Sequence, residues 1–187
     1  MIIGDVTLKA SRVSRSSVGR AYFEIVDTLE DNNKKILVNF YDKSYPTLFE
    51  VDIYTGRKKK LSTSPAQRGD ILLDEDKVVR AAWGENTSNE KVFYYRKSSD
   101  DDWELHSQRN FGDGAITPLS FTDEGKNLIV LCSINNPITV VCKYYPETKQ
   151  LEEIYRHPKV DVEFTLEDKD SDQPIAAVIF DGKPEYI

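Results

Sequence analysis

FTDEGKNLIVLCSINNPITVVCKYYPETKQLEEI, residues 121–154, decides the fold, because this single stretch holds a complete antiparallel unit. The acidic turn Asp123–Gly125 ends in a glycine, which can adopt the positive φ that a tight hairpin needs. The apolar run Leu128–Cys132 follows this turn. Two further apolar runs, Ile138–Tyr144 and Leu151–Tyr155, follow after two more turns. The stretch therefore predicts four short strands joined by three tight turns.

The opening of this stretch, an apolar residue before an acidic turn and a second apolar run, recurs along the chain. The equivalent first residues are spaced by 44, 48 and 45 positions, at Leu29, Leu73, Phe121 and Leu166. A second motif, the turn around Thr55, recurs around Thr148, which is 93 residues or about two periods later. A repeat of roughly 40–50 residues with four strands per period is typical of a β-propeller. Two motifs in phase favour a propeller over an ordinary β-sandwich.

We therefore expect an all-β fold, a partial β-propeller of about four blades, each a four-stranded antiparallel sheet. The blades are predicted at residues 22–63, 70–109, 115–157 and 161–187, after an irregular segment, 1–21, in which Val6–Ala10 has a strand pattern. The last blade is incomplete and lacks its fourth strand. An open sheet edge of this kind predicts that the sequence is part of something longer, or that copies associate through open blade edges.

Composition restricts the classes of partner. A hydrophobic content of 39% and a charged content of 30% are those of a soluble globular protein. The formal net charge of −7 opposes electrostatic binding to nucleic acid or to anionic membranes. No run of about 18 apolar residues predicts a transmembrane helix, and the N-terminus lacks the apolar core of a secretory signal. The compartment stays open between cytoplasm and periplasm.

The two cysteines, Cys132 and Cys142, lie on adjacent predicted strands and could face each other across the hairpin. Two cysteines are too few for a disulfide framework or a four-cysteine metal site. We favour the interpretation that both are buried free thiols, which pack as small apolar residues.

The sequence contains no pattern for nucleophilic catalysis. The G-x-S-x-G elbow of hydrolases is absent, and the serine-rich segment Ser14–Gly19 lacks its leading glycine. The histidines, His106 and His157, lie near the ends of outer strands in different blades, where solvated or edge-packed side chains are expected. We therefore predict no catalytic residue. No phosphate-binding glycine loop is present, so no cofactor is expected.

The charged segments of the sequence have structural explanations. The acidic segments Asp100–Asp102 and Glu167–Asp170 lack the spacing of a calcium loop and are expected in solvated turns, and neither histidine has a second ligand at metal-binding spacing. The basic run Arg57–Lys60 is expected to keep an outer strand from pairing. Asn86–Ser88 fits a glycosylation acceptor, a pattern that is common by chance.

The tryptophans, Trp83 and Trp103, could line a binding face, but core packing between sheets is the favoured interpretation.

Over residues 22–187 the chain resembles the N-terminal propeller of prolyl-oligopeptidase-family serine peptidases, in particular the dipeptidyl aminopeptidase and acylaminoacyl peptidase branch. Each motif is weakly specific, but their order along the chain makes the resemblance more specific. The segments that carry it are Ile25–Leu29, Ile36–Val38, Tyr45–Gly56, Val78–Gly84, Lys91–Arg96, His157–Val162 and Phe180–Ile187.

The resemblance implies a non-catalytic segment that gates peptide access to an α/β-hydrolase domain, which would be its partner. In that family the catalytic serine, aspartate and histidine belong to the hydrolase domain, and no residue here matches their motifs. The family's propellers have about seven or eight blades, whereas about four are recognisable here. Our first hypothesis is therefore a propeller segment of such a peptidase, without activity of its own. The second is a stand-alone β-repeat module that binds peptides or proteins, and the third, a complete peptidase, is disfavoured by the absent elbow.

Overall fold

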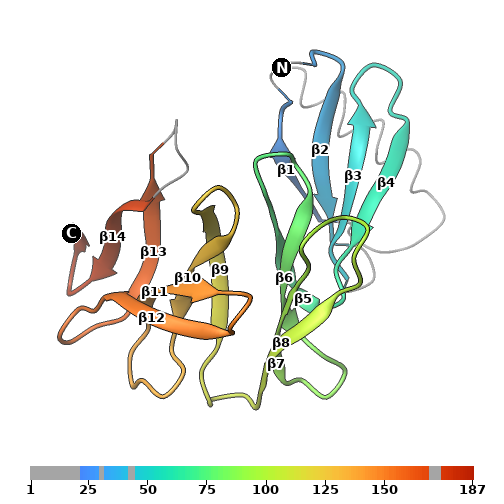
Figure 1. The fold of residues 1–187 in the computed structure, drawn as a ribbon. Helices are drawn as coiled ribbons and strands as arrows, with labels where there is room; N and C mark the ends of the chain where they lie inside the picture. Colours follow the sequence, from blue (N-terminus) through green and yellow to red (C-terminus); the bar gives the residue numbers. More distant parts are fainter. Residues whose placement is uncertain (1–21, 30–31, 42–44, 169–173) are drawn as a thin grey trace. The chain divides into compact units, whose positions relative to one another are not determined.

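The computed structural model describes residues 22–29, 32–41, 45–168 and 174–187. Every regular element in these residues is a β-strand, as the composition predicts, and the strands form four separate antiparallel sheets (Figure 1). The chain divides after Ser64 into two compact units. The N-terminal unit contains one sheet and the C-terminal unit contains three.

Sheet A, in the N-terminal unit, has the sequential strand order β1-β2-β3-β4. Its strands are β1 (Phe23–Asp27), β2 (Lys35–Phe40), β3 (Thr47–Asp52) and β4 (Lys58–Thr63). The basic run lies on the outer strand β4, where Lys58, Lys59 and Lys60 are exposed. Lys58 Nζ lies 4.6 Å from the centre of the Phe40 ring, so its charge is partly stabilised by the aromatic face while the row stays in solvent.

The C-terminal unit contains sheets B, C and D, and in each of them consecutive strands pair with one another. Sheet B consists of β5 (Gln67–Leu73), β6 (Val79–Glu85), β7 (Lys91–Tyr95) and β8 (Glu104–Arg109). Sheet C consists of β9 (Ile116–Thr122), β10 (Asn127–Cys132), β11 (Val140–Tyr145) and β12 (Gln150–Tyr155). Sheet D has only three strands, β13 (Val162–Glu167), β14 (Pro174–Phe180) and β15 (Pro184–Tyr186).

The opening turn of sheet C has the backbone that its sequence predicts. Gly125 has φ 76°, and Asp123 and Glu124 before it are also left-handed, at 54° and 57°. The turn sets the register that pairs Phe121 with Leu128, so both apolar side chains face the same side of the sheet.

Large aromatic and aliphatic side chains join sheets B and C in one core. Phe93 and Tyr95 of sheet B pack with Phe121, Leu128 and Tyr144 of sheet C. The rings of Phe93 and Tyr144 meet edge to face, with centroids 5.3 Å apart. Sheets C and D share a second, smaller core, which contains Ile129, Val141, Val162, Ala177 and Ile179. Sheet C is therefore covered on both faces, which explains why its strand β10 has a continuous apolar run instead of an alternating one.

Strand bounds differ from the expected ones where glycine and bulges obscure the pattern. β5 begins at Gln67, three residues before the expected start at Asp70, because a bulge between Gln67 and Asp70 accommodates Arg68 with φ 46°. β6 continues through Gly84 to Glu85. The predicted strand pattern at Val6–Ala10 lies outside the described residues.

Candidate interaction site between sheets B and C

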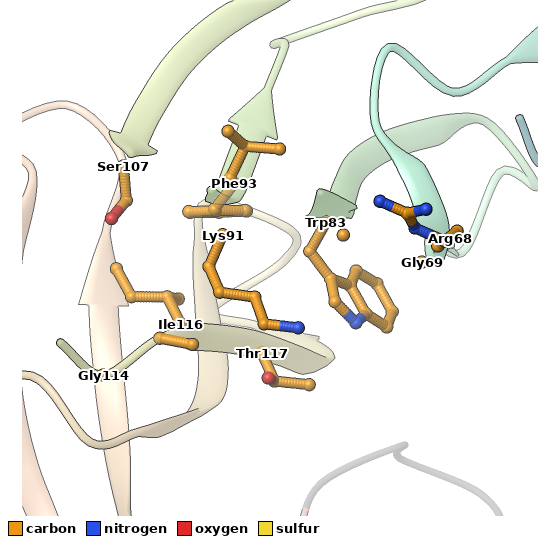
Figure 2. A pocket seen from close by; sticks show the side chains of 12 residues that line it. Arg68, Gly69, Trp83, Lys91, Phe93, Ser107, Gly114, Ile116 and Thr117 are labelled. Atoms are coloured by element: carbon orange, nitrogen blue, oxygen red, sulfur yellow. The ribbon is translucent and has the colours of Figure 1, made fainter. Parts of the chain in front are cut away.

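A cavity of about 250 Å³ lies between sheets B and C, next to the β6–β7 turn and the connection from β8 to β9. Trp83, Phe93 and Ile116 give it an apolar surface, and Arg68 and Lys91 add two positive charges (Figure 2). Gly69, Gly84 and Gly114 contribute backbone instead of side chains. We call this space the B–C cavity. It combines apolar walls with few polar groups, which is the usual character of a binding pocket.

The pairing register of sheet B places these side chains in rows across the sheet. One row joins Trp83 to Phe93 and Phe93 to Ser107. The next row lies two residues away on each strand, and it joins Glu85 to Lys91 and Lys91 to Arg109. Because residues two apart on a strand share a face, both rows lie on the side of sheet B that faces sheet C. Charged groups thus stand at the rim of the cavity and aromatic groups stand inside it.

Glu85 links the two cations of the cavity. Its carboxylate accepts a hydrogen bond from Nε of Arg68 at 2.7 Å and one from Nζ of Lys91 at 3.0 Å. These hydrogen bonds, that from Lys91 first, lower the pKa of Glu85, so the carboxylate stays ionised at neutral pH. Arg68 also donates to Asn89 of the β6–β7 turn. The network fixes the rim of the cavity.

Two glycines allow β5 and β6 to approach each other closely below this rim. A Cβ on Gly69 would lie 1.7 Å from the carbonyl oxygen of Trp83, and one on Gly84 would lie 2.3 Å from that of Gln67. Side chains at these positions are therefore excluded. The bulge beside them turns the Arg68 side chain toward Glu85, as bulges commonly do near functional sites.

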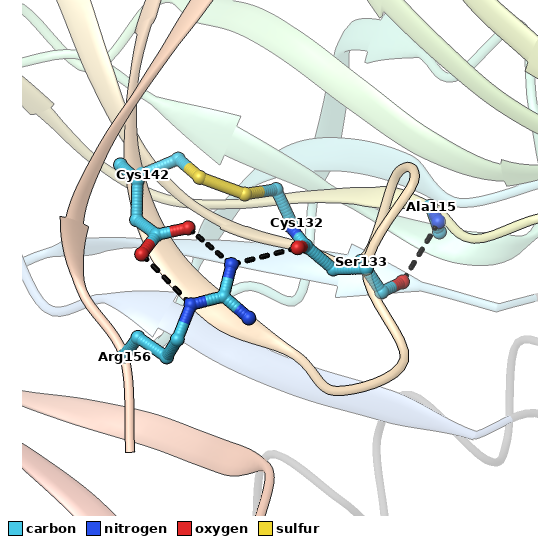
Figure 3. Close-up of a disulfide and its surroundings, with 7 residues drawn as sticks. Ala115, Cys132, Ser133, Cys142 and Arg156 are labelled. Atoms are coloured by element: carbon cyan, nitrogen blue, oxygen red, sulfur yellow. Dashed lines mark hydrogen bonds and ion pairs between the residues drawn. A yellow bond between two sulfur atoms is a disulfide. The ribbon is translucent and has the colours of Figure 1, made fainter. Parts of the chain in front are cut away.

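A disulfide joins Cys132 and Cys142 in sheet C, close to the part of the sheet that lines the cavity (Figure 3). This bond corrects our interpretation of the cysteines as free thiols. In the observed register Cys132 pairs with Val140 and Val130 pairs with Cys142, so the cysteines are diagonal neighbours on one face, with Cα atoms 6.1 Å apart. The next residue, Ser133, accepts a hydrogen bond from the backbone N–H of Ala115 at 3.1 Å. Ala115 lines the cavity.

A second cavity, of about 460 Å³, lies at the opposite ends of the same strands and is lined mainly by charged residues. Lys149 of sheet C and Glu104 of sheet B form an ion pair at 2.6 Å across it. Lys97 and Glu147 form another at 3.6 Å. Because its charges pair with one another and it lacks an apolar wall like that of Trp83 and Phe93, we regard it as a solvated seam between the sheets.

His106 lies beside this seam and is more deeply buried than expected for a solvated or edge-packed residue. Its side chain is 1% exposed, and its Nδ1 shares a hydrogen bond of 2.8 Å with the hydroxyl of Tyr144. Nε2 lies 3.3 Å from the carboxylate of Glu104, but without the alignment of a hydrogen bond. Burial lowers the pKa of His106 and raises that of Tyr144. The bulge in the β7–β8 pairing turns His106 toward sheet C, which its sequence position did not indicate.

The other residues considered from sequence are scattered. His157 lies in the connection after sheet C, where its Nδ1 accepts a hydrogen bond from the backbone N–H of Val160. Asp100, Asp101 and Asp102 are exposed in the β7–β8 turn, and the segment Glu167–Asp170 lies partly outside the described residues. Asn86 uses its side chain to bond Ser88 and Glu90 within the β6–β7 turn.

The tryptophans take different roles. Trp83 packs against the core between sheets B and C, as the favoured interpretation predicts, and it also lines the cavity. Trp103 stacks under the guanidinium of Arg96 at 4.4 Å, outside that core. The described residues contain no group of His, Cys, Asp or Glu side chains that could hold a metal ion. They also contain no helix long and apolar enough to cross a membrane.

Comparisons with known proteins show the fold and no closer relationship. No protein family profile and no curated protein matches the chain. Among solved structures, TolB from Acinetobacter baumannii is 12% identical with a TM-score of 0.50, over 82% of this chain and 40% of that one. A protein assigned as TolB from Agrobacterium tumefaciens is 12% identical with a TM-score of 0.43, over 87% of this chain and 72% of that one. The chain thus spans about 40% of the length of the Acinetobacter protein.

The likeness to the Acinetobacter TolB, a β-propeller protein, confirms the predicted fold class. The chain is an all-β partial β-propeller of about four blades, of which the last is smaller and incomplete. A likeness at 12% identity shows the fold alone, so the resemblance to prolyl-oligopeptidase-family peptidases stays a prediction.

Proposed function

We propose that this chain is a non-catalytic interaction module that binds a peptide or a peptide segment of a partner protein at the B–C cavity. The observation that carries the proposal is the cavity itself. It places the indole of Trp83 and the phenyl ring of Phe93 beside two cations. The two rings belong to β6 and β7, the central strands of sheet B, which are each hydrogen-bonded to a strand on either side. Aromatic and arginine side chains are the commonest anchors of protein interfaces.

The surroundings of the cavity support this role. Phe111, in the connection that leads to β9, is 82% exposed, and its ring lies 5.7 Å from Nζ of Lys91. An exposed phenylalanine beside a cavity with a half-buried tryptophan offers apolar contacts on both sides of a bound chain. The volume of about 250 Å³ is below the usual range for small-molecule pockets and suits a single side chain of a peptide.

Selection of peptides against the whole chain tests this proposal. Random dodecapeptides displayed on phage are selected on the immobilised protein, and the affinities of the enriched peptides are measured by calorimetry. We expect Trp83→Ala to weaken binding at least tenfold, because it removes the largest apolar surface of the cavity. Trp103→Ala is the matched control, because Trp103 does not line the cavity, and it should leave the affinity unchanged.

A second variant separates binding from folding. Thr117 lines the cavity from β9, and Thr117→Phe should fill part of the space without removing a core residue. Both variants are first checked for an unchanged circular dichroism spectrum. If enriched peptides bind the folded Trp83→Ala and Thr117→Phe variants as tightly as the original chain, the cavity is not the binding site and the proposal fails.

The propeller of a prolyl-oligopeptidase-like peptidase is a second candidate, which the order of the sequence motifs at Tyr45–Gly56 and Val78–Gly84 favours. In that case the chain gates peptide access to an α/β-hydrolase domain, and the peptide bound at the B–C cavity is a substrate in transit. The test is the coding sequence after residue 187. A following α/β segment with a G-x-S-x-G motif supports this candidate, and its absence from the full reading frame contradicts it.

A further inference from the structure

We infer that the group recognised in the B–C cavity is a carboxylate, presented by an aspartate or glutamate side chain or by the C-terminus of a peptide. This inference rests on the proposed function and adds the chemistry of the ligand. Its basis is the charge around the cavity, which is positive in a protein whose net charge is −7.

Three cations lie close to one another at this end of sheet B. Arg68 and Lys91 line the cavity, and Arg109 is the direct cross-strand partner of Lys91. Glu85 is the one acidic residue in their row, and no acidic residue is among those that line the cavity in the described part of the chain. The Glu85 carboxylate thus contacts two of these cations, Arg68 and Lys91, and the third, Arg109, lies next to Lys91. A second carboxylate from a ligand would offset one of the two positive charges that Glu85 leaves unbalanced.

The cations keep donors for a ligand after the bonds to Glu85 are formed. Lys91 has three N–H donors and gives one to Glu85, and Arg68 has five and uses Nε for Glu85 and Nη2 for Asn89. The Nε of Arg109 is buried and has no hydrogen-bond partner among the described residues. Charge-assisted bonds of this type are the stronger ones, so a carboxylate is preferred over a neutral amide.

The backbone conformation of Arg68 supports a role for this residue in ligand binding. Arg68 has φ 46°, in the left-handed region that residues with a Cβ seldom adopt. The bulge that holds it is flanked by glycine contacts that exclude side chains at positions 69 and 84. Local strain of this kind is concentrated at ligand-binding positions. The apolar rings of Trp83 and Phe111 then select an apolar residue next to the carboxylate.

The experiment uses the peptides enriched on the whole chain. Each is resynthesised with every Asp and Glu changed to Asn and Gln, with an amidated C-terminus, or with both changes. We expect one of these changes to weaken binding about tenfold or more, which also identifies whether a side chain or the C-terminus supplies the carboxylate. The Lys91→Met variant should bind the unchanged peptides about tenfold more weakly and with a smaller dependence on salt.

Lys126→Met is the matched control, because Lys126 also pairs with a neighbouring glutamate, Glu124 at 3.0 Å, but lies away from the cavity. It should leave the affinity unchanged. Peptides that depend on Trp83 but tolerate loss of every carboxylate and the Lys91→Met change would overturn the carboxylate inference and leave the proposed function standing. Binding that is insensitive to both Trp83→Ala and Thr117→Phe would overturn both.

Discussion

His106 is a titratable residue enclosed between two sheets, with Tyr144 on one nitrogen and Glu104 and Lys149 near the other. Burial lowers its pKa, an effect that the nearby Glu104 carboxylate opposes. The neutral form therefore belongs to the folded state. An unfolded chain, in which histidine titrates at about pH 6.5, binds more protons than the folded chain just below that pH.

We expect the free energy of unfolding to fall as the pH is lowered from about 7.5 to about 5, because protonation of His106 favours the unfolded chain. The decrease should begin near the unfolded pKa of about 6.5, before the carboxylates are protonated. Urea unfolding followed by tryptophan fluorescence at several pH values measures it. His106→Gln, which keeps a polar group beside Tyr144, should flatten this part of the curve.

His157→Gln serves as the control, because His157 lies in a connection and not between sheets. It should retain the decrease in stability. An equally steep curve in the His106→Gln variant would show that another group causes the pH dependence.

Among the elements, the pair β5 and β6 depends on the absence of side chains at its closest point. Gly84 has φ 151°, and a Cβ there would lie 2.3 Å from the carbonyl oxygen of Gln67. Gly84→Ala should therefore destabilise the protein by about 2 kcal/mol or more, because it combines an unfavourable backbone conformation with a clash. Urea unfolding of the variant measures this loss.

Gly182 provides the matched comparison. It lies in the turn between β14 and β15 with φ 79°, and nothing lies within 4 Å of the Cβ that an alanine would add. Gly182→Ala should cost only the backbone term, about 1 kcal/mol. If both variants lose the same stability, close contact between β5 and β6 contributes nothing beyond the conformation of glycine.

The hairpins of the fold could be predicted because each depends on neighbouring residues. The turn at Gly125 and the apolar run Leu128–Cys132 define their own pairing, and the recurrence of such turns was enough to predict the repeated sheets. The B–C cavity could not be predicted in this way. Its cations come together only through the register of β6, β7 and β8 and through the bulge at Arg68, and neither is visible in the local sequence.

The cysteines illustrate the same limit at closer range. The sequence placed Cys132 and Cys142 on adjacent strands, but whether they could bond depended on a diagonal offset of two residues. His106 was assigned to a strand end for a similar reason, because its burial results from the bulge between β7 and β8. The pairing of neighbouring strands is encoded locally, whereas their exact register and the contacts between sheets are not.

At the scale of the whole molecule, sheet D exposes apolar side chains on the face away from sheet C. Phe164 pairs with Val178 and Val178 with Tyr186, and none of these three belongs to the core shared with sheet C. Phe164, Leu166, Phe180 and Tyr186 are all exposed. Among the described strands, the outer strand β15 pairs only with β14. We therefore propose that copies associate through this open blade.

Multi-angle light scattering over a range of concentrations should show a species heavier than the monomer, which the double change Phe164→Lys and Tyr186→Lys shifts toward the monomer. The charges oppose burial of this face. Phe111→Lys is the control for general surface adhesion, because Phe111 is more exposed but lies outside sheet D. A pure monomer at high concentration would contradict association through the open blade.

Sheet C has both faces covered, one by the core with sheet B and the other by the core with sheet D. Water can reach the peptide groups of β10 and β11 only after one of these neighbours separates. Their amide protons should thus exchange with solvent on the slowest timescale in the C-terminal unit, while those of β15 exchange early. We therefore expect the middle blade of this unit to keep its structure longer than the blades on either side of it.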